Sequence, residues 1–111
     1  MGAREFRRVR SNLIIKFNTD PQKVEQFVAA IKEVIVKNEF TNKEKYQVIL
    51  NDFGVYGLDI LVNFFLNVPD KKSEQRERHI IMMEILKLAD SIGIEFAMPE
   101  RAGDKYKAQV S

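Results

Sequence analysis

Cysteine is absent from the 111 residues of this chain, and histidine occurs only once. A chain without cysteine has no disulfide bond, no thiolate nucleophile and no cysteine-ligated zinc. The single histidine, His79, cannot form a histidine-based metal site alone, and its charged neighbours Arg76, Glu77 and Arg78 indicate a surface position. We therefore predict no metal and no cofactor.

Long apolar runs and a dominant charge are also missing. The longest apolar runs, such as Leu13–Ile15 and Ile80–Met83, are far shorter than the ~20 residues that a membrane-spanning helix needs. The first residues, MGARE, lack the apolar core of a signal peptide. Lys and Arg number 18 against 16 Asp and Glu, a net charge of +2, which is too small to indicate a nucleic-acid-binding protein. A hydrophobic content of 45% supports one folded domain of this length.

Three segments are expected along the chain: a basic lead-in or linker from an upstream domain over 1–10, a domain over 11–101, and a polar tail over 102–111. Arginine dominates the segment Arg4–Arg10. We interpret this segment as a solvated lead-in strand, with contact to an acidic partner as the alternative.

The first half of the domain predicts a strand and a helix. Leu13, Ile15 and Phe17 alternate on one face of a strand. Thr19 or Asp20 then caps a helix that ends near Asn38. Its apolar stripe recurs at helical spacing and comprises Val24, Phe27, Val28, Ile31 and Ile35.

The second half predicts a hairpin, a second helix and a short strand. Val48 and Leu50 face the core from a strand over 47–53, and Gly54–Gly57 forms the link, its glycines free to take positive φ. The strand Leu58–Val68 alternates most regularly and is expected to be central. A helix capped by Ser73 stops at Gly93, with an apolar stripe of Ile81, Ile85, Leu88 and Ile92 and Ala89 beside it, and 94–96 forms the last strand.

This order, β-α-β-β-α-β, predicts an α+β ferredoxin-like sandwich. Its four-stranded antiparallel sheet carries both helices on one face. RNA-recognition domains share the order, but the strand over Leu58–Val68 contains no Lys or Arg beside Phe65, so no base-stacking platform is expected.

No catalytic pattern is found. Asp52 and Asp59 flank the hairpin, but solvated strand ends explain them better than an acid–base pair. The serines lack a nucleophile-elbow sequence, and Gly54 and Gly57 lack the spacing of a phosphate-binding loop. We predict that the chain is not an enzyme.

Two groups of apolar residues exceed what one core needs. A helix on a sheet needs one stripe, yet a second sector of the later helix and the open sheet face both carry apolar side chains. We predict a subunit interface at Ile14, Ile49, Leu61 and Phe65 on the sheet and at His79, Met82, Met83 and Leu86 on the helix.

Three segments resemble the C-terminal domain of the small-conductance mechanosensitive channel (MscS) family. Residues 13–24 (LIIKFNTDPQKV) are similar to its strand followed by Tyr/Phe-x-Thr-x-Pro-x-x-Val. Residues 48–62 are similar to its middle hairpin. Residues 93–100 (GIEFAMPE) resemble its closing Gly-Ile-x-Ile/Phe-Pro-x-Pro-Gln, although Ala97 and Glu100 depart from that pattern. The resemblance covers roughly residues 8 to 101.

The resemblance implies a cytoplasmic domain of a homo-heptameric channel that releases solutes under osmotic stress. The domain then forms part of the vestibule wall on the cytoplasmic side of the cell membrane. Its partners are the other subunits, and it meets the membrane only through upstream helices absent from this chain. The alternatives are a stand-alone ferredoxin-like module that senses a small molecule, and an acylphosphatase-like enzyme, for which no phosphate-binding loop is evident.

Overall fold

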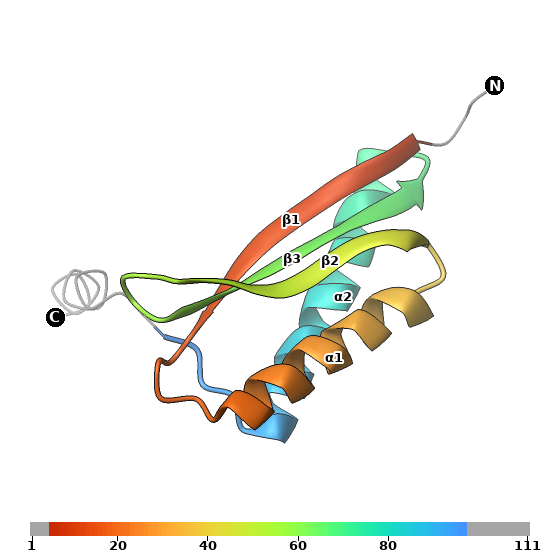
Figure 1. The fold of residues 1–111 in the computed structure, drawn as a ribbon. Coiled ribbons are helices and arrows are strands. Elements are labelled where there is room, and N and C mark those ends of the chain that lie inside the picture. Colours follow the sequence, from red (N-terminus) through yellow and green to blue (C-terminus); the bar gives the residue numbers. More distant parts are fainter. Residues whose placement is uncertain (1–4, 98–111) are drawn as a thin grey trace, which may run out of the picture.

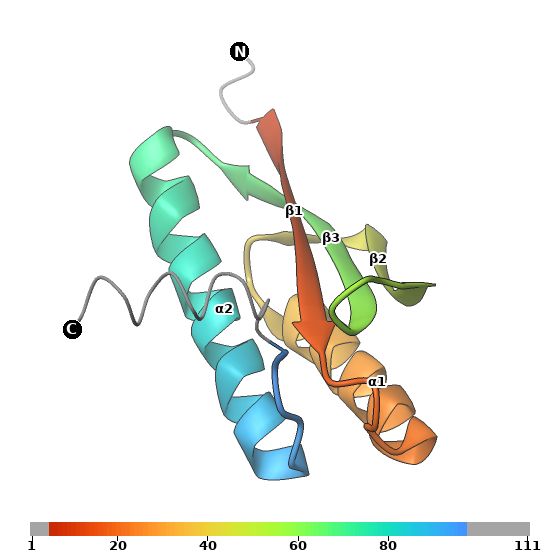
Figure 2. The same cartoon turned by 90° about the vertical axis from the view of Figure 1, so that its left-hand side faces the viewer.

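A sheet and a pair of helices form the two layers of the structure, a computed structural model that describes residues 5–97. The elements are β1 (Glu5–Ile15), α1 (Pro21–Lys37), β2 (Thr41–Phe53), β3 (Leu58–Val68) and α2 (Lys71–Ile92). Both helices lie on one face of the sheet, α1 against β2 and α2 against β3 (Figures 1 and 2). The predicted α+β class is confirmed.

The sheet of the described residues has three antiparallel strands in the order β1-β3-β2. The predicted fourth strand is reduced to one antiparallel bridge between Ile15 and Phe96 at the β1 edge. Two hydrogen bonds hold it: the Lys16 N–H donates to the Glu95 carbonyl at 3.0 Å, and the Ala97 N–H donates to the Ile14 carbonyl at 2.9 Å. This contact is too short to form a ladder, so the four-stranded ferredoxin-like sheet is not confirmed.

The central strand is β3, as predicted. All six residues on its helix-facing side are buried: Leu58, Ile60, Val62, Phe64, Leu66 and Val68. A strand with neighbours on both edges and helices across one face excludes water along its whole length, which explains why its alternation is so regular.

β1 begins far earlier than the predicted strand. It pairs with β3 without interruption from Glu5 opposite Val68 to Ile15 opposite Leu58. The predicted limit between the lead-in over 1–10 and the domain over 11–101 therefore falls inside β1. The tail over 102–111 lies outside the described residues, and the division of the chain stays a prediction.

The arginines in the first part of β1 explain why the sequence did not predict that this part belongs to the sheet. Within the segment Arg4–Arg10, Val9 is buried while Arg8 and Arg10 point away from the helices. Nε of Arg8 donates to Oδ1 of Asn63 at 3.1 Å. Nη1 of Arg7, on the helix side, lies 3.4 Å from Oε1 of Glu74 in α2. Arg7, Arg8 and Arg10 therefore lie in a strand that pairs with β3.

The helix caps are aspartates. At α1 the carboxylate of Asp20 accepts from the Gln22 N–H at 2.9 Å, while the Thr19 hydroxyl donates to the Lys16 carbonyl. At α2 the cap is Asp70, whose Oδ1 accepts from the Ser73 N–H at 2.8 Å. The prediction of Ser73 as the cap was wrong by three positions, because a serine inside the first turn resembles a cap in sequence.

The buried stripes agree with the helical spacing, with one exception. α1 buries Val24, Phe27, Ile31 and Ile35, and α2 buries Ile81, Ile85 and Ala89. α2 also buries Glu77, which is only 7% exposed although it is charged and lies between Arg76 and Arg78. Nδ2 of Asn38, the residue that ends α1, donates to Oε1 of Glu77 at 3.5 Å. A polar contact between the helices therefore replaces the apolar one at this end.

Acid should weaken the α2 cap. Hydrogen bonds from Ser73 hold the pKa of Asp70 below its ordinary value of 3.8. A carboxylate with a lowered pKa stabilises the fold above that value, and its contribution is lost as the pH falls through the folded-state pKa. Asp70→Asn keeps the acceptor but cannot titrate. We expect the thermal midpoint of the wild type to fall more steeply on acidification than that of Asp70→Asn. Parallel pH curves for the two proteins would contradict this role.

Candidate functional site

The described residues offer no centre for metal chemistry. No group of three or more His, Cys, Asp or Glu side chains within 5–97 is placed to hold a metal ion. Asp52 and Asp59 lie directly opposite each other on β2 and β3. Oδ1 of Asp59 accepts from Nδ2 of Asn12 at 2.8 Å, and Oδ1 of Asp52 accepts from the Phe53 N–H. Both carboxylates lie near strand ends, next to the link of the hairpin.

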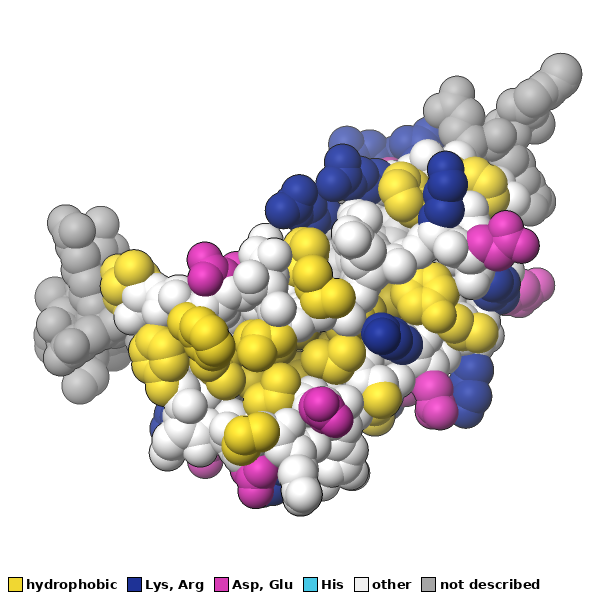
Figure 3. All heavy atoms as spheres, viewed as in Figure 1, with side chains coloured by type: hydrophobic (Ala, Val, Ile, Leu, Met, Phe, Trp, Pro, Cys, Tyr) yellow, Lys and Arg dark blue, Asp and Glu magenta, His cyan; other side chains and the backbone are white. Residues whose placement is uncertain are grey.

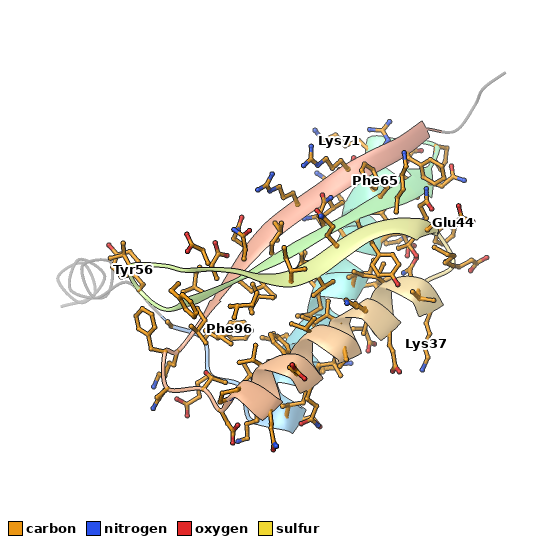
Figure 4. The ribbon with its side chains drawn as sticks, viewed as in Figure 1. Lys37, Glu44, Tyr56, Phe65, Lys71 and Phe96 are labelled. Atoms are coloured by element: carbon orange, nitrogen blue, oxygen red, sulfur yellow. The ribbon has the colours of Figure 1, made fainter. Side chains whose placement is uncertain are left out.

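The four residues predicted on the open sheet face lie there, but they do not form one patch. Ile49 and Leu61 are opposite each other on β2 and β3. Leu61 is buried within the single chain, with 7% of its surface exposed, whereas Ile49 is 41% exposed. Ile14 lies one row away, opposite Asp59. Phe65, half-buried, faces Arg8 near the far end of β3 (Figure 4). Only Ile14, Ile49 and Leu61 are therefore neighbours.

The four residues predicted on α2 do form one surface. Ile80, Ile81, Glu84 and Leu88 line a hollow of about 340 Å³ together with α1, so that side of α2 faces α1. At 100° per residue the other flank carries His79, Met82, Met83 and Leu86, which we call the α2 ridge. Met82 is half-buried against the core, while Met83 is 39% and Leu86 is 52% exposed.

A further apolar surface was not predicted as such, although Ile49 of the predicted interface is one of its lining residues. A groove of about 750 Å³ lies between α1 and the free edge of β2, and we call it the α1–β2 groove. Its apolar lining comes mainly from Phe17, Val24, Val28, Val48, Leu50, Phe53 and Leu58, with Glu25 and Lys32 of α1 as its charged residues. In Figure 3 hydrophobic side chains gather over α1 and the adjacent end of the β2–β3 hairpin.

One core assignment failed at this groove, and one residue lies beyond its predicted strand. Phe17 was predicted to share one face of the first strand with Leu13 and Ile15, but β1 ends at Ile15 and Phe17 is 55% exposed. Leu50 was predicted to face the core, yet it is 42% exposed. Leu50 does point to the helix side of the sheet, opposite Ile60. The hairpin continues beyond the cover that α1 provides, so this side of it stays open.

The hairpin composition was the available signal for this surface. Turns are usually polar, but the end of this hairpin presents Phe53, Val55 and Tyr56, which are 72%, 86% and 48% exposed. Figure 4 shows Tyr56 at the tip. The link Gly54–Gly57 is confirmed by a hydrogen bond from the Gly54 N–H to the Gly57 carbonyl at 2.8 Å. Neither glycine of the link has a positive φ, since within 5–97 only Gly93 has one.

No helix within the described residues has the length and hydrophobicity to cross a membrane. The helices of this domain are amphipathic and cover a sheet. The candidate site consists of two apolar surfaces on a small two-layer domain: the concave α1–β2 groove and the convex α2 ridge.

Solved structures share this fold. The Arabidopsis thaliana MSL1 wild-type structure superposes with a TM-score of 0.75 at 17% identity, over 87% of this chain and 34% of that chain. The closed-state structure of Helicobacter pylori MscS superposes with a TM-score of 0.65 at 21% identity, over 84% of this chain and 35% of that chain. At these identities the likeness establishes the fold alone.

Sequence comparison establishes the family. A curated relative from Aquifex aeolicus, described as an uncharacterized MscS family protein, is 26% identical over 100 residues, which are 89% of this chain and 27% of the relative. The chain thus spans about a quarter to a third of the length of these relatives. The family model described as "Mechanosensitive ion channel MscS, C-terminal" matches residues 12–96. The chain belongs to the MscS family of mechanosensitive ion channels and carries its C-terminal domain.

Proposed function

We propose that this chain is the cytoplasmic domain of a mechanosensitive channel, in which it forms part of the vestibule wall and holds neighbouring subunits together. The observation that carries the proposal is the family match over residues 12–96, which covers both helices, β2, β3 and the last four residues of β1. The two exposed apolar surfaces support the subunit contacts, because exposed aromatic and methionine side chains are enriched at protein interfaces.

The role is mechanical and needs no bond chemistry. The partners are further copies of the same subunit in a homo-heptameric ring on the cytoplasmic side of the cell membrane. The ligand-sensing alternative has less support, since the α1–β2 groove is open and brings together only two charged side chains, Glu25 and Lys32.

We also propose that the ferredoxin-like order is completed in the assembled protein. Phe96 already lies at the β1 edge, where the fourth strand of a β-α-β-β-α-β domain belongs. Its ring packs edge-to-face on Phe27 of α1, with centroids 6.4 Å apart (Figure 4). The salt bridge between Lys16 and Glu95, at 2.7 Å, holds the same segment.

A chimera tests the channel role. Residues 12–96 would replace the matching C-terminal part of Helicobacter pylori MscS, and the protein would be produced in bacteria lacking their own mechanosensitive channels. We expect tension-gated currents in membrane patches and survival of hypo-osmotic shock, because the transplanted domain should restore the contacts between subunits. The control is the same protein truncated before the domain. A chimera that reaches the membrane in normal amount but neither assembles nor conducts would reject the proposal.

A further inference from the structure

We propose that the α1–β2 groove of one copy of this domain receives the α2 ridge of the next copy. The proposal rests on the proposed function, since it names the surfaces through which neighbouring subunits meet. It turns two separate exposed surfaces into the two halves of one contact.

The two surfaces lie on opposite flanks of the helix layer. The groove is on the β2 side of α1. The flank of α2 that faces α1 is occupied by Ile80, Glu84 and Leu88, so the α2 ridge points away from α1 and from the groove. Figure 2 shows α1 and α2 side by side beneath the sheet, which leaves their outer flanks on opposite sides. One copy therefore cannot fill its own groove with its own ridge.

Shape determines how copies pair. A concave surface cannot pack against an identical concave surface around a two-fold axis, so the groove requires a different surface on its partner. Such head-to-tail contacts repeat from copy to copy and either close into a ring or continue as a filament. A groove on one flank and a ridge on the other match this geometry.

The side chains fit a helix laid in a groove. His79, Met83 and Leu86 are spaced four and three residues apart, the spacing of anchors on one face of a helix. The groove offers Phe17 and Phe53 at its open end, which are 55% and 72% exposed. Methionine is flexible and makes favourable contacts with aromatic rings, so Met82 and Met83 suit this lining.

The position of the chain ends favours a second copy as the occupant. Relatives are about 2.4 to 3.3 times as long as this chain, and the family match is to their C-terminal part, so most of their length precedes it. That part joins at Glu5, at the opposite end of β1 from the hairpin (Figure 1). Eleven residues of β1 separate the two ends, roughly 35 Å of extended strand. The upstream part of the same subunit therefore attaches away from the groove.

Disulfide trapping in the cysteine-free chain tests the contact. Phe53→Cys marks the groove and Leu86→Cys marks the ridge, and both positions are more than half exposed, so folding is preserved. We expect an equal mixture of the two full-length variants to form the 53–86 heterodimer about tenfold faster than either homodimer under mild oxidation, a preference worth ~1.4 kcal/mol. The doubly substituted chain should form a ladder of oligomers.

Two matched variants serve as controls. Ile80→Cys is on the α1-facing side of the same helix and is 43% exposed, and Phe6→Cys is an equally apolar position, 52% exposed, at the far end of β1. Either control reacting as fast as its partner variant would overturn the proposal, as would a dominant 53–53 homodimer. A heterodimer seen only after removal of residues 98–111 would assign the groove to the chain's own C-terminal segment and also overturn it. The chimera keeps the native Phe53 and Leu86. If the chimera conducts while the cysteine variants form no 53–86 cross-link, the proposed contact is rejected and the proposed channel function still holds.

Discussion

Phe64→Ala is expected to lower the free energy of unfolding by about 3–5 kcal/mol. Phe64 is fully buried on β3, between Val9 of β1 and Tyr46 of β2. Removing its ring leaves a cavity that the paired strands on both sides prevent from collapsing. Since domains of this size are stable by only about 5–15 kcal/mol, this one change would remove a large part of the total. Denaturant unfolding followed by circular dichroism measures the loss as a shift in midpoint.

The next residue is the matched control. Phe65 has the same side chain and the same strand, but it is half-buried on the open face, opposite Arg8. Phe65→Ala is expected to cost clearly less, because part of its ring is already in water and little cavity forms. Equal losses for the two variants would show that the open face is as dry as the helix-covered face, contrary to the two-layer arrangement.

The contrast between β3 and β1 shows which local patterns a sequence reveals. β3 has helices across one face and strands on both edges, so alternation alone identified the six residues that it buries against the helices. β1 hides its first half because an edge position allows Arg8 and Arg10 to extend into solvent while Val9 stays buried. The charge pattern there favours a solvated lead-in strand, and only the pairing with β3 shows that this strand belongs to the sheet.

The two apolar surfaces differ in the same way. The α2 ridge could be predicted because its residues share one flank of a single helix, a property that the helical period fixes locally. The α1–β2 groove depends on how far the hairpin extends beyond α1, which is a matter of tertiary placement. Leu50 faces the correct side of the sheet, yet it stays 42% exposed, because it lines the open groove beside α1. Periodicity in the sequence predicts which face of the sheet a side chain lies on, but it does not predict whether a helix covers that side chain.

Gly57→Ala should disrupt the junction between the hairpin and β1. A Cβ atom on Gly57 would overlap the carbonyl oxygen of Ile15 and lie 3.1 Å from a side-chain carbon of Ile14. The first of these atoms is backbone in a paired strand, so it cannot rotate away. Insertion of a methyl group into a closely packed site costs about 1–3 kcal/mol, and we expect a value at the upper end of that range.

The effect of Gly57→Ala should also reach the C-terminal segment. Ile15 bridges to Phe96, so a displaced Ile15 carbonyl would shift the backbone amide resonances of Lys16 and Phe96. Gly54→Ala is the control, because its Cβ would meet only the Gly57 carbonyl, at 3.3 Å, and Gly54 has no positive φ that would strain an alanine. Unfolding midpoints and amide spectra of the two variants distinguish a local clash from general loss of turn flexibility. If both alanines cost the same, the close approach of Gly57 to β1 would not be what makes glycine necessary there. If Gly57→Ala alone shifts the amide resonances of Lys16 and Phe96, the hairpin and the Ile15–Phe96 bridge are structurally coupled at the end of the sheet where the groove opens.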